Sequence, residues 1–408
     1  MVRLMLTMLI LSGKGTSAMA QTAMDREWPT SFALPLPDYG RYEGTPGFPS
    51  EMPVSSALRA ALELIDEDLD LQWDEPLRPG PRPDLVQLLF MGVTGEAFAF
   101  LWFPKGDERP PLDPTVYWPD PGAPYQRALA AAGFTCEVLV RPGLAGGPGQ
   151  GEPLDAQALK DRVRSCLADQ RLPAIIAGIP EPGGFMLVVG YGDDGDVLTG
   201  WPASGGGPVS RNAGDMVQVH DWTGAAQLAV LLTGREEPPT ERATMRDALE
   251  QAVRLLRMTE AGPYHAGPAT FEVWAEALLS DDPPDVSVPP NRRPQSVAGR
   301  RRWLICPTAW DLMERAHYAE RFLDRAVVVF PAAADDLGAA AANMREVASL
   351  MQQAEKVMGG ARGPQPEDGY PNADDPEARR QVAEIVLQCR DKELEAADHL
   401  AAALQLAE

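Results

Sequence analysis

The sequence GGFMLVVGYGDDGDVLTGW (residues 183–201) decides the fold of the chain around it. Residues 185–191 form an apolar run that is typical of a buried strand, and residues 196–201 supply a second strand. Between them, Asp193, Asp194 and Gly195 indicate a tight turn, because glycine adopts a positive φ without strain. The stretch therefore predicts an antiparallel hairpin with buried strands.

Helices and further strands surround this hairpin. The first helical pattern begins at Ser55 or Ser56, and a serine there would cap the helix N-terminus. Other strands are predicted at residues 97–103, 134–140, 174–177 and 228–232, and other helices at residues 84–91, 125–132 and 154–172. Helices come first and a mostly antiparallel sheet comes second, which is the layout of an α+β fold.

The character of the chain changes after Pro238. Helices are predicted at residues 240–261, 270–279, 307–329, 332–357 and 375–406, with an irregular, Pro-rich loop at residues 280–302. These helices lack a sustained heptad pattern, so a helical bundle is favoured over a coiled coil. We therefore divide the chain into an α+β domain (residues 24–235) and an α-helical domain (residues 236–408).

The composition excludes several classes of partner. The 408 residues include 36 Lys and Arg against 59 Asp and Glu, a formal net charge of −23. Nucleic acid and anionic membrane surfaces both require clustered positive charge, so neither is an expected partner. Hydrophobic residues make up 45% of the chain, which is enough for a sizeable core. We predict a soluble protein without a membrane span.

The N-terminus resembles an export signal. Arg3 is followed by an apolar run at residues 4–11 and by Ala18 and Ala20 in an A-x-A pattern, which predicts cleavage after Ala20. The apolar run is far shorter than the ~20 residues of a transmembrane helix. The alternative is a cytoplasmic protein whose translation starts at Met24, and Lys14 favours that alternative because it lies awkwardly before the cleavage site.

The cysteines and histidines predict neither a metal site nor a cofactor. A structural zinc site needs closely spaced ligands, such as a CxxC pair, and the chain has none. The turn at residues 190–196 resembles a calcium loop but lacks its bidentate glutamate, so a plain hairpin is favoured. His265 is predicted in a loop, whereas His317 is predicted to be packed and partly buried. The eight residues concerned lie far apart: Cys136, Cys166, Cys306, Cys389, His220, His265, His317 and His399.

Three further sequence segments occur together with the hairpin. They are MGVTGEAF at residues 91–98, YQRALAAAGF at residues 125–134 and PAIIA at residues 173–177. Together with the hairpin they resemble the papain-like fold of bacteriocin-processing peptidases. The resemblance is closer to the N-terminal domain family of the butirosin-biosynthesis protein BtrH and its bacterial relatives, and it covers roughly residues 50–235. The helical region is similar to the region that trails this domain in those relatives.

The resemblance implies three catalytic positions, and this chain lacks all three groups. Papain-like enzymes of this type need a Cys at the start of the first core helix, a His that opens the strand at residues 185–191, and an Asp or Asn that ends the next strand before a Pro. The helix start near residues 52–56 has no Cys, the His position is Phe185, and Trp201 precedes Pro202. The resemblance therefore implies a catalytically degenerate domain without catalytic residues.

The former active-site cleft would then be apolar and able to bind a ligand. We predict a scaffold or a protein that binds a peptide, an acyl chain or a protein partner. A BtrH-like acyltransferase or amide-processing enzyme that uses other residues is the alternative. If Glu96 does not face the cleft, it is expected to be an exposed loop carboxylate. The cleft candidates are Met52, Ser55, Thr94, Glu96, Phe185 and Trp201.

Overall fold

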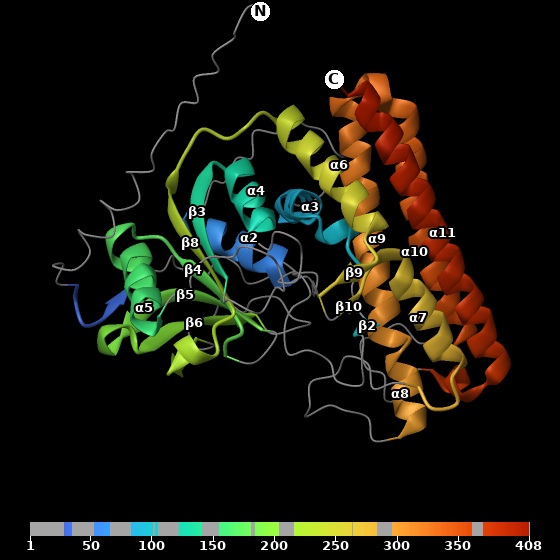
Figure 1. Cartoon of the computed structure of the whole chain (residues 1–408), viewed down its shortest axis with the longest axis horizontal. Helices are drawn as coiled ribbons and strands as arrows, with labels where there is room; N and C mark the ends of the chain where they lie inside the picture. The colour runs from blue at the N-terminus through green and yellow to red at the C-terminus, as the bar shows by residue number, and fades with distance from the viewer. Residues whose placement is uncertain are drawn as a thin grey trace, which may run out of the picture.

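The computed structural model describes eleven segments of the chain, and the structural account concerns these. They are residues 28–34, 53–65, 83–100, 103–104, 122–140, 155–180, 184–203, 216–262, 264–283, 296–360 and 370–407. The predicted export signal at residues 1–23 lies outside them, as does Met52. Within them the chain forms an antiparallel sheet flanked by helices and a helical C-terminal region (Figure 1), which confirms the α+β class.

The main sheet is antiparallel at every described pairing. The predicted hairpin is present in its centre, where Phe185 pairs with Ala203 and Gly192 pairs with Val197. Gly195 has the expected positive φ of 91°. In spatial order the strands are β3 (Phe134–Val140), β8 (Leu228–Arg235), β4 (Ala174–Ala177), β5 (Phe185–Gly192), β6 (Val197–Ala203) and β7 (Val217–His220), with β1 (Phe32–Ala33) beside β5.

Helices flank the sheet and build the C-terminal half. In Figure 1, α2, α3 and α4 lie between the sheet and the long C-terminal helices, whereas α5 lies on the far side of the sheet. The helices are α2 (Pro53–Ile65), α3 (Pro83–Thr94), α4 (Ala123–Ala131), α5 (Ala156–Arg164), α6 (Glu241–Arg257), α7 (Gly267–Leu279), α8 (Val297–Trp303), α9 (Cys306–Val329), α10 (Ala334–Val357) and α11 (Pro376–Leu406). Thr240 caps α6 by accepting from the Ala243 N–H at 3.3 Å.

Several predicted elements differ from the observed ones. In the region expected to be a strand at residues 97–103, the described residues include a 3₁₀ turn, η2 (Glu96–Phe98), and the start of the short strand β2 (Phe103–Pro104). Strand β2 pairs with β10 (Tyr264–His265), which in turn pairs with β9 (Glu260–Ala261). The helix expected to end before Gly92 continues to Thr94. The helix expected at residues 154–172 changes to a π-helical turn after Arg164. The loop expected at residues 280–302 contains most of α8.

The α3 helix passes through Gly92 because that position faces another helix. A Cβ atom at Gly92 would overlap the ring of Phe322 on α9, so only glycine allows this approach. The helix ends instead at Gly95, which has a φ of 88°. Phe98 of η2 then packs edge-on against Phe322, with ring centroids 6.2 Å apart. Tertiary packing of α3 on α9 thus overrides the local signal of a glycine in a helical pattern.

One hydrophobic cluster is continuous across the predicted domain boundary. It joins buried residues of the sheet and of α2–α4 to residues of α6, α9, α10 and α11, and a second cluster joins Phe100 to residues of the helical region. The boundary itself falls between the end of β8 at Arg235 and the start of α6 at Glu241. The two halves therefore pack directly against each other through apolar side chains.

The segment at residues 28–34 is attached to the sheet. Its strand β1 pairs with β5, and the hydroxyl of Tyr191 donates to the carbonyl of Pro29 at 3.1 Å. The guanidinium of Arg164 lies 4.8 Å from the Trp28 ring centroid, and the Trp28 indole N–H donates to Asp169 at 3.2 Å. The segment at residues 28–34 is therefore an integral part of the fold.

Candidate functional site

The two aromatic residues at the transferred catalytic positions are core residues. Phe185 begins β5 and Trp201 lies on β6, and both side chains are fully buried. Both belong to the hydrophobic cluster that the sheet shares with α2. Because neither side chain reaches solvent, the exposure expected of an apolar cleft is absent at these two positions.

The start of the first core helix lies one turn earlier than predicted. The α2 helix begins at Pro53, so Ser55 and Ser56 are helical residues, and the prediction that one of them is the N-cap is wrong. The adjoining cleft candidate, Met52, lies outside the described residues. The backbone therefore places Ser55 in the first turn of a helix that packs on the central strands.

Thr94 and Glu96 lie together in the buried turn between α3 and η2. The Thr94 hydroxyl donates to the Phe90 carbonyl at 2.6 Å, and its oxygen accepts from the Glu96 backbone N–H at 3.2 Å. Thr94 is fully buried, and Glu96 is only 2% exposed. The expectation that Glu96 is an exposed loop carboxylate is therefore wrong, because the turn is enclosed by α9.

Charged residues of the C-terminal helices meet this turn. Arg315 on α9 donates to the backbone carbonyl of Glu96 at 2.5 Å and to Asp311 Oδ2 at 2.8 Å. Asp311 is fully buried. Glu393 on α11 is buried, and desolvation raises the pKa of its carboxyl to about 8. The positive charge of Arg315 acts in the opposite direction and lowers this pKa, but its effect is smaller.

This group forms a polar junction between the two halves of the chain. We call Thr94, Glu96, Asp311, Arg315 and Glu393 the polar junction. The first two of these residues were candidates from the sequence, and the other three were not. The spacing of Asp311 and Arg315, four residues apart on a predicted helix, was the available signal for an intrahelical pair. The arrangement holds the turn against α9.

The described cysteines are protonated thiols. Cys136, Cys166 and Cys389 are free. Burial raises the pKa of Cys136 and of Cys166 to about 12, with Glu236 and Glu137 respectively adding to the effect. Burial likewise raises the pKa of Cys389 well above its ordinary value. Because the thiolate is the reactive form, these three thiols are inert as nucleophiles at neutral pH. Cys306 begins α9, and its side chain lies outside the described residues.

The histidines lie in four separate places. His265 is in strand β10 rather than in the predicted loop. His317 is 58% exposed and lies 4.0 Å from Glu320, so the prediction of a packed, partly buried histidine is wrong. His399 Nδ1 lies 3.1 Å from Asp336 Oδ1, and His220 is exposed at the end of β7. The described residues include no group of His, Cys, Asp and Glu that could hold a metal ion.

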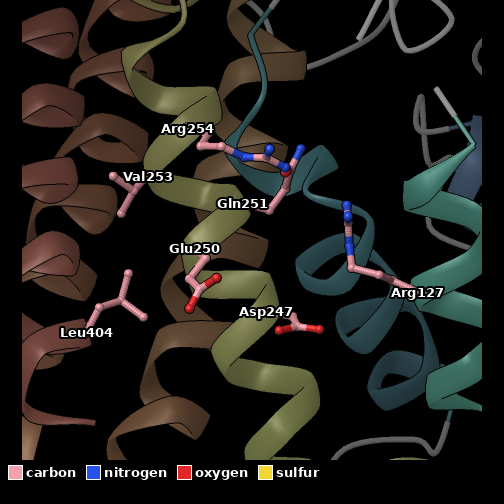
Figure 2. A pocket seen from close by; sticks show the side chains of 7 residues that line it. All are labelled: Arg127, Asp247, Glu250, Gln251, Val253, Arg254 and Leu404. Atoms are coloured by element: carbon pink, nitrogen blue, oxygen red, sulfur yellow. The ribbon is translucent and has the colours of Figure 1, made fainter. Parts of the chain in front are cut away.

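A depression crosses the junction between α4, α6 and α11. Its volume is about 400 Å³, and Figure 2 shows its side chains. Arg127 extends from α4 toward the part of α6 that carries Gln251 and Arg254. No local sequence pattern indicates this depression, because its residues come from three helices that are far apart in the chain. It is lined by Arg127, Asp247, Glu250, Gln251, Val253, Arg254 and Leu404.

Two further findings bear on the class of protein. Among the described helices, none has a stretch long and apolar enough to cross a bilayer. No protein-family model matches the chain, and no curated protein matches it.

Proposed function

We propose that this protein is a non-catalytic binding protein or scaffold, built on a papain-like domain whose catalytic positions are filled. The observation that carries the proposal is the complete burial of Phe185 and Trp201, which stand at the positions of the expected His and its acceptor. A cysteine or serine nucleophile needs an adjacent base to become reactive. Phenylalanine and tryptophan side chains cannot provide one.

The state of the cysteines supports the same proposal. The three described thiols have raised pKa values, which is the opposite of what a catalytic cysteine requires.

The polar junction also supports the proposal of a non-catalytic protein. Arg315 joins α9 to the Glu96 backbone carbonyl of η2 and pairs with Asp311 within α9, as expected for residues that stabilise the packing of two halves.

Covalent labelling of the native protein tests this proposal. The full chain is incubated at neutral pH with a fluorophosphonate and, separately, with iodoacetamide, and the products are quantified by intact-protein mass spectrometry. We expect no rapid stoichiometric labelling by either reagent. The Ser55→Ala variant, with Ser56→Ala as its matched control, and the Cys306→Ser variant identify any residue that does react.

Rapid labelling of a single residue would reject the proposal. If the fluorophosphonate adduct were lost in Ser55→Ala but kept in Ser56→Ala, or if the iodoacetamide adduct were lost in Cys306→Ser, the protein would have an activated nucleophile. That result would favour the BtrH-like acyltransferase or amide-processing enzyme. The unfolded protein provides the reference rate, because every cysteine is then accessible.

A further inference from the structure

We propose that the depression between α4, α6 and α11 binds a short peptide with free termini. The inference rests on the proposed function, because it names a ligand class for a non-catalytic binding protein. The depression combines cationic, anionic and apolar groups in about 400 Å³, which is within the usual range of small-ligand sites. Each kind of group matches one part of a short peptide.

The cationic groups lie at one end of the depression. Arg254 is exposed on α6, and its guanidinium donates to the side-chain oxygen of the buried Gln251. Arg127 is half-buried on α4, and its Nε donates to the backbone carbonyl of Val93 at 3.3 Å. These two contacts orient the guanidinium groups from opposite sides of the gap between α4 and α6. Guanidinium groups bind carboxylates through paired, charge-assisted hydrogen bonds, so a peptide C-terminus fits here.

The anionic groups lie on α6, closer to its N-terminus than Arg254. Asp247 is exposed on α6 and precedes Arg254 by seven residues, which is close to two helical turns and about 10 Å along the axis. Glu250 lies between them and contacts Arg246 at 3.4 Å. Asp247 is therefore the carboxylate best placed to accept the ammonium group of a ligand whose carboxylate is bound at Arg254.

This separation sets the length of the ligand. An extended chain covers about 3.3–3.6 Å for each residue, so about three residues span the roughly 10 Å between the two charged ends. The half-buried Val253 and Leu404 provide an apolar side for the central side chain. Because the chain as a whole carries a net charge of −23, the two arginines are needed to offset repulsion of the ligand carboxylate.

Calorimetric titration of the full chain with the unblocked tripeptide Ala-Leu-Ala tests the inference. We expect saturable binding with a dissociation constant below about 1 mM. Amidation of the peptide C-terminus should weaken binding to the unmodified protein about tenfold or more, and so should acetylation of its N-terminus. The Arg254→Met variant should lose a similar factor. Arg257→Met is the matched control, because Arg257 is an exposed arginine on α6 outside the depression.

Measuring the blocked peptides with the protein variants shows which residue binds each terminus of the peptide. In Arg254→Met, amidation of the peptide should weaken binding less than it does in the unmodified protein, since one of the two guanidinium groups that hold the carboxylate is gone. In Asp247→Asn, acetylation of the peptide should have no further effect. Absence of binding at 10 mM peptide, equal binding of a peptide blocked at both ends, or an equal loss in Arg257→Met would each overturn the inference. These outcomes are independent of covalent labelling, so failure of this site and failure of the proposed non-catalytic function are distinguishable.

Discussion

Replacement of Glu393 by glutamine should stabilise the protein at neutral and alkaline pH. Glu393 lies on α11 and is 5% exposed. Desolvation raises the pKa of its carboxyl from 4.5 to about 8, although the positive charge of Arg315 acts in the opposite direction. At pH 7 the folded protein therefore keeps this carboxyl neutral, whereas the unfolded chain releases the proton.

The sign and size of the effect depend on this difference. Between the two pKa values the unfolded state binds fewer protons, so the free energy of unfolding falls by about 1.4 kcal/mol for each pH unit. The contribution of the neutral Glu393 carboxyl to the free energy of unfolding is fully present below pH 4.5 and is lost as the pH rises to about 8. Relative to its value below pH 4.5, the free energy of unfolding is then lower by about 3 kcal/mol at pH 7 and by about 5 kcal/mol above pH 8. Glutamine is similar in size and does not titrate, so it removes this cost.

Denaturant unfolding followed by circular dichroism measures the effect. The unmodified protein, Glu393→Gln and Glu384→Gln are compared at pH 5.5, 7 and 9, and Glu384 is the control because it is exposed on the same helix. The advantage of Glu393→Gln should grow from about 1 kcal/mol at pH 5.5 to about 5 kcal/mol at pH 9. The control should stay within about 0.5 kcal/mol of the unmodified protein. A difference that is constant with pH, or that shrinks as the pH rises, would refute the reasoning.

Two further substitutions test how the halves are joined. Gly92→Ala should lower the free energy of unfolding by about 1–3 kcal/mol, because the added methyl group overlaps the Phe322 ring. Adding Phe322→Leu to that variant should restore part of the loss in thermal unfolding, and no restoration would contradict the packing argument. Arg242→Met should cost about 1–2 kcal/mol, because Arg242 donates to the carbonyl of Val329 at the end of α9 (3.1 Å) and to that of Ala407, the C-cap residue of α11 (2.9 Å). An equal loss in the control Arg246→Met would contradict a specific role for Arg242.

Strong periodic segments could be predicted well from the sequence. The strands at residues 134–140 and 174–177 were predicted with their observed bounds, and the hairpin turn at Gly195 is present. Thr240 and Asp375 stand at helix starts, where their side chains accept backbone hydrogen bonds. These features depend on neighbouring residues alone, namely the hydrophobic period, the capping group and the permitted φ angle.

The candidate site could be predicted only in part. The absence of the catalytic Cys and His is visible in the sequence once the resemblance is accepted. The burial of Phe185 and Trp201 is not visible there, because an aromatic residue next to a glycine-rich loop can line a cleft or fill a core. Glu96 shows the same limit. A carboxylate in a Gly95-Glu96 turn has the sequence of an exposed loop, and only the packing of α9 over the turn encloses it.

The sequence by itself determined the α+β class, the order of sheet and helical region, and the positions of the main strands. Those properties are local or compositional. Only the tertiary structure decided which distant residues lie together. Arg315 contacts the backbone carbonyl of Glu96, and Arg127 and Arg254 line the same depression. Such pairs join residues more than a hundred positions apart, and no local pattern specifies them because the approach of two helices depends on packing along their whole length.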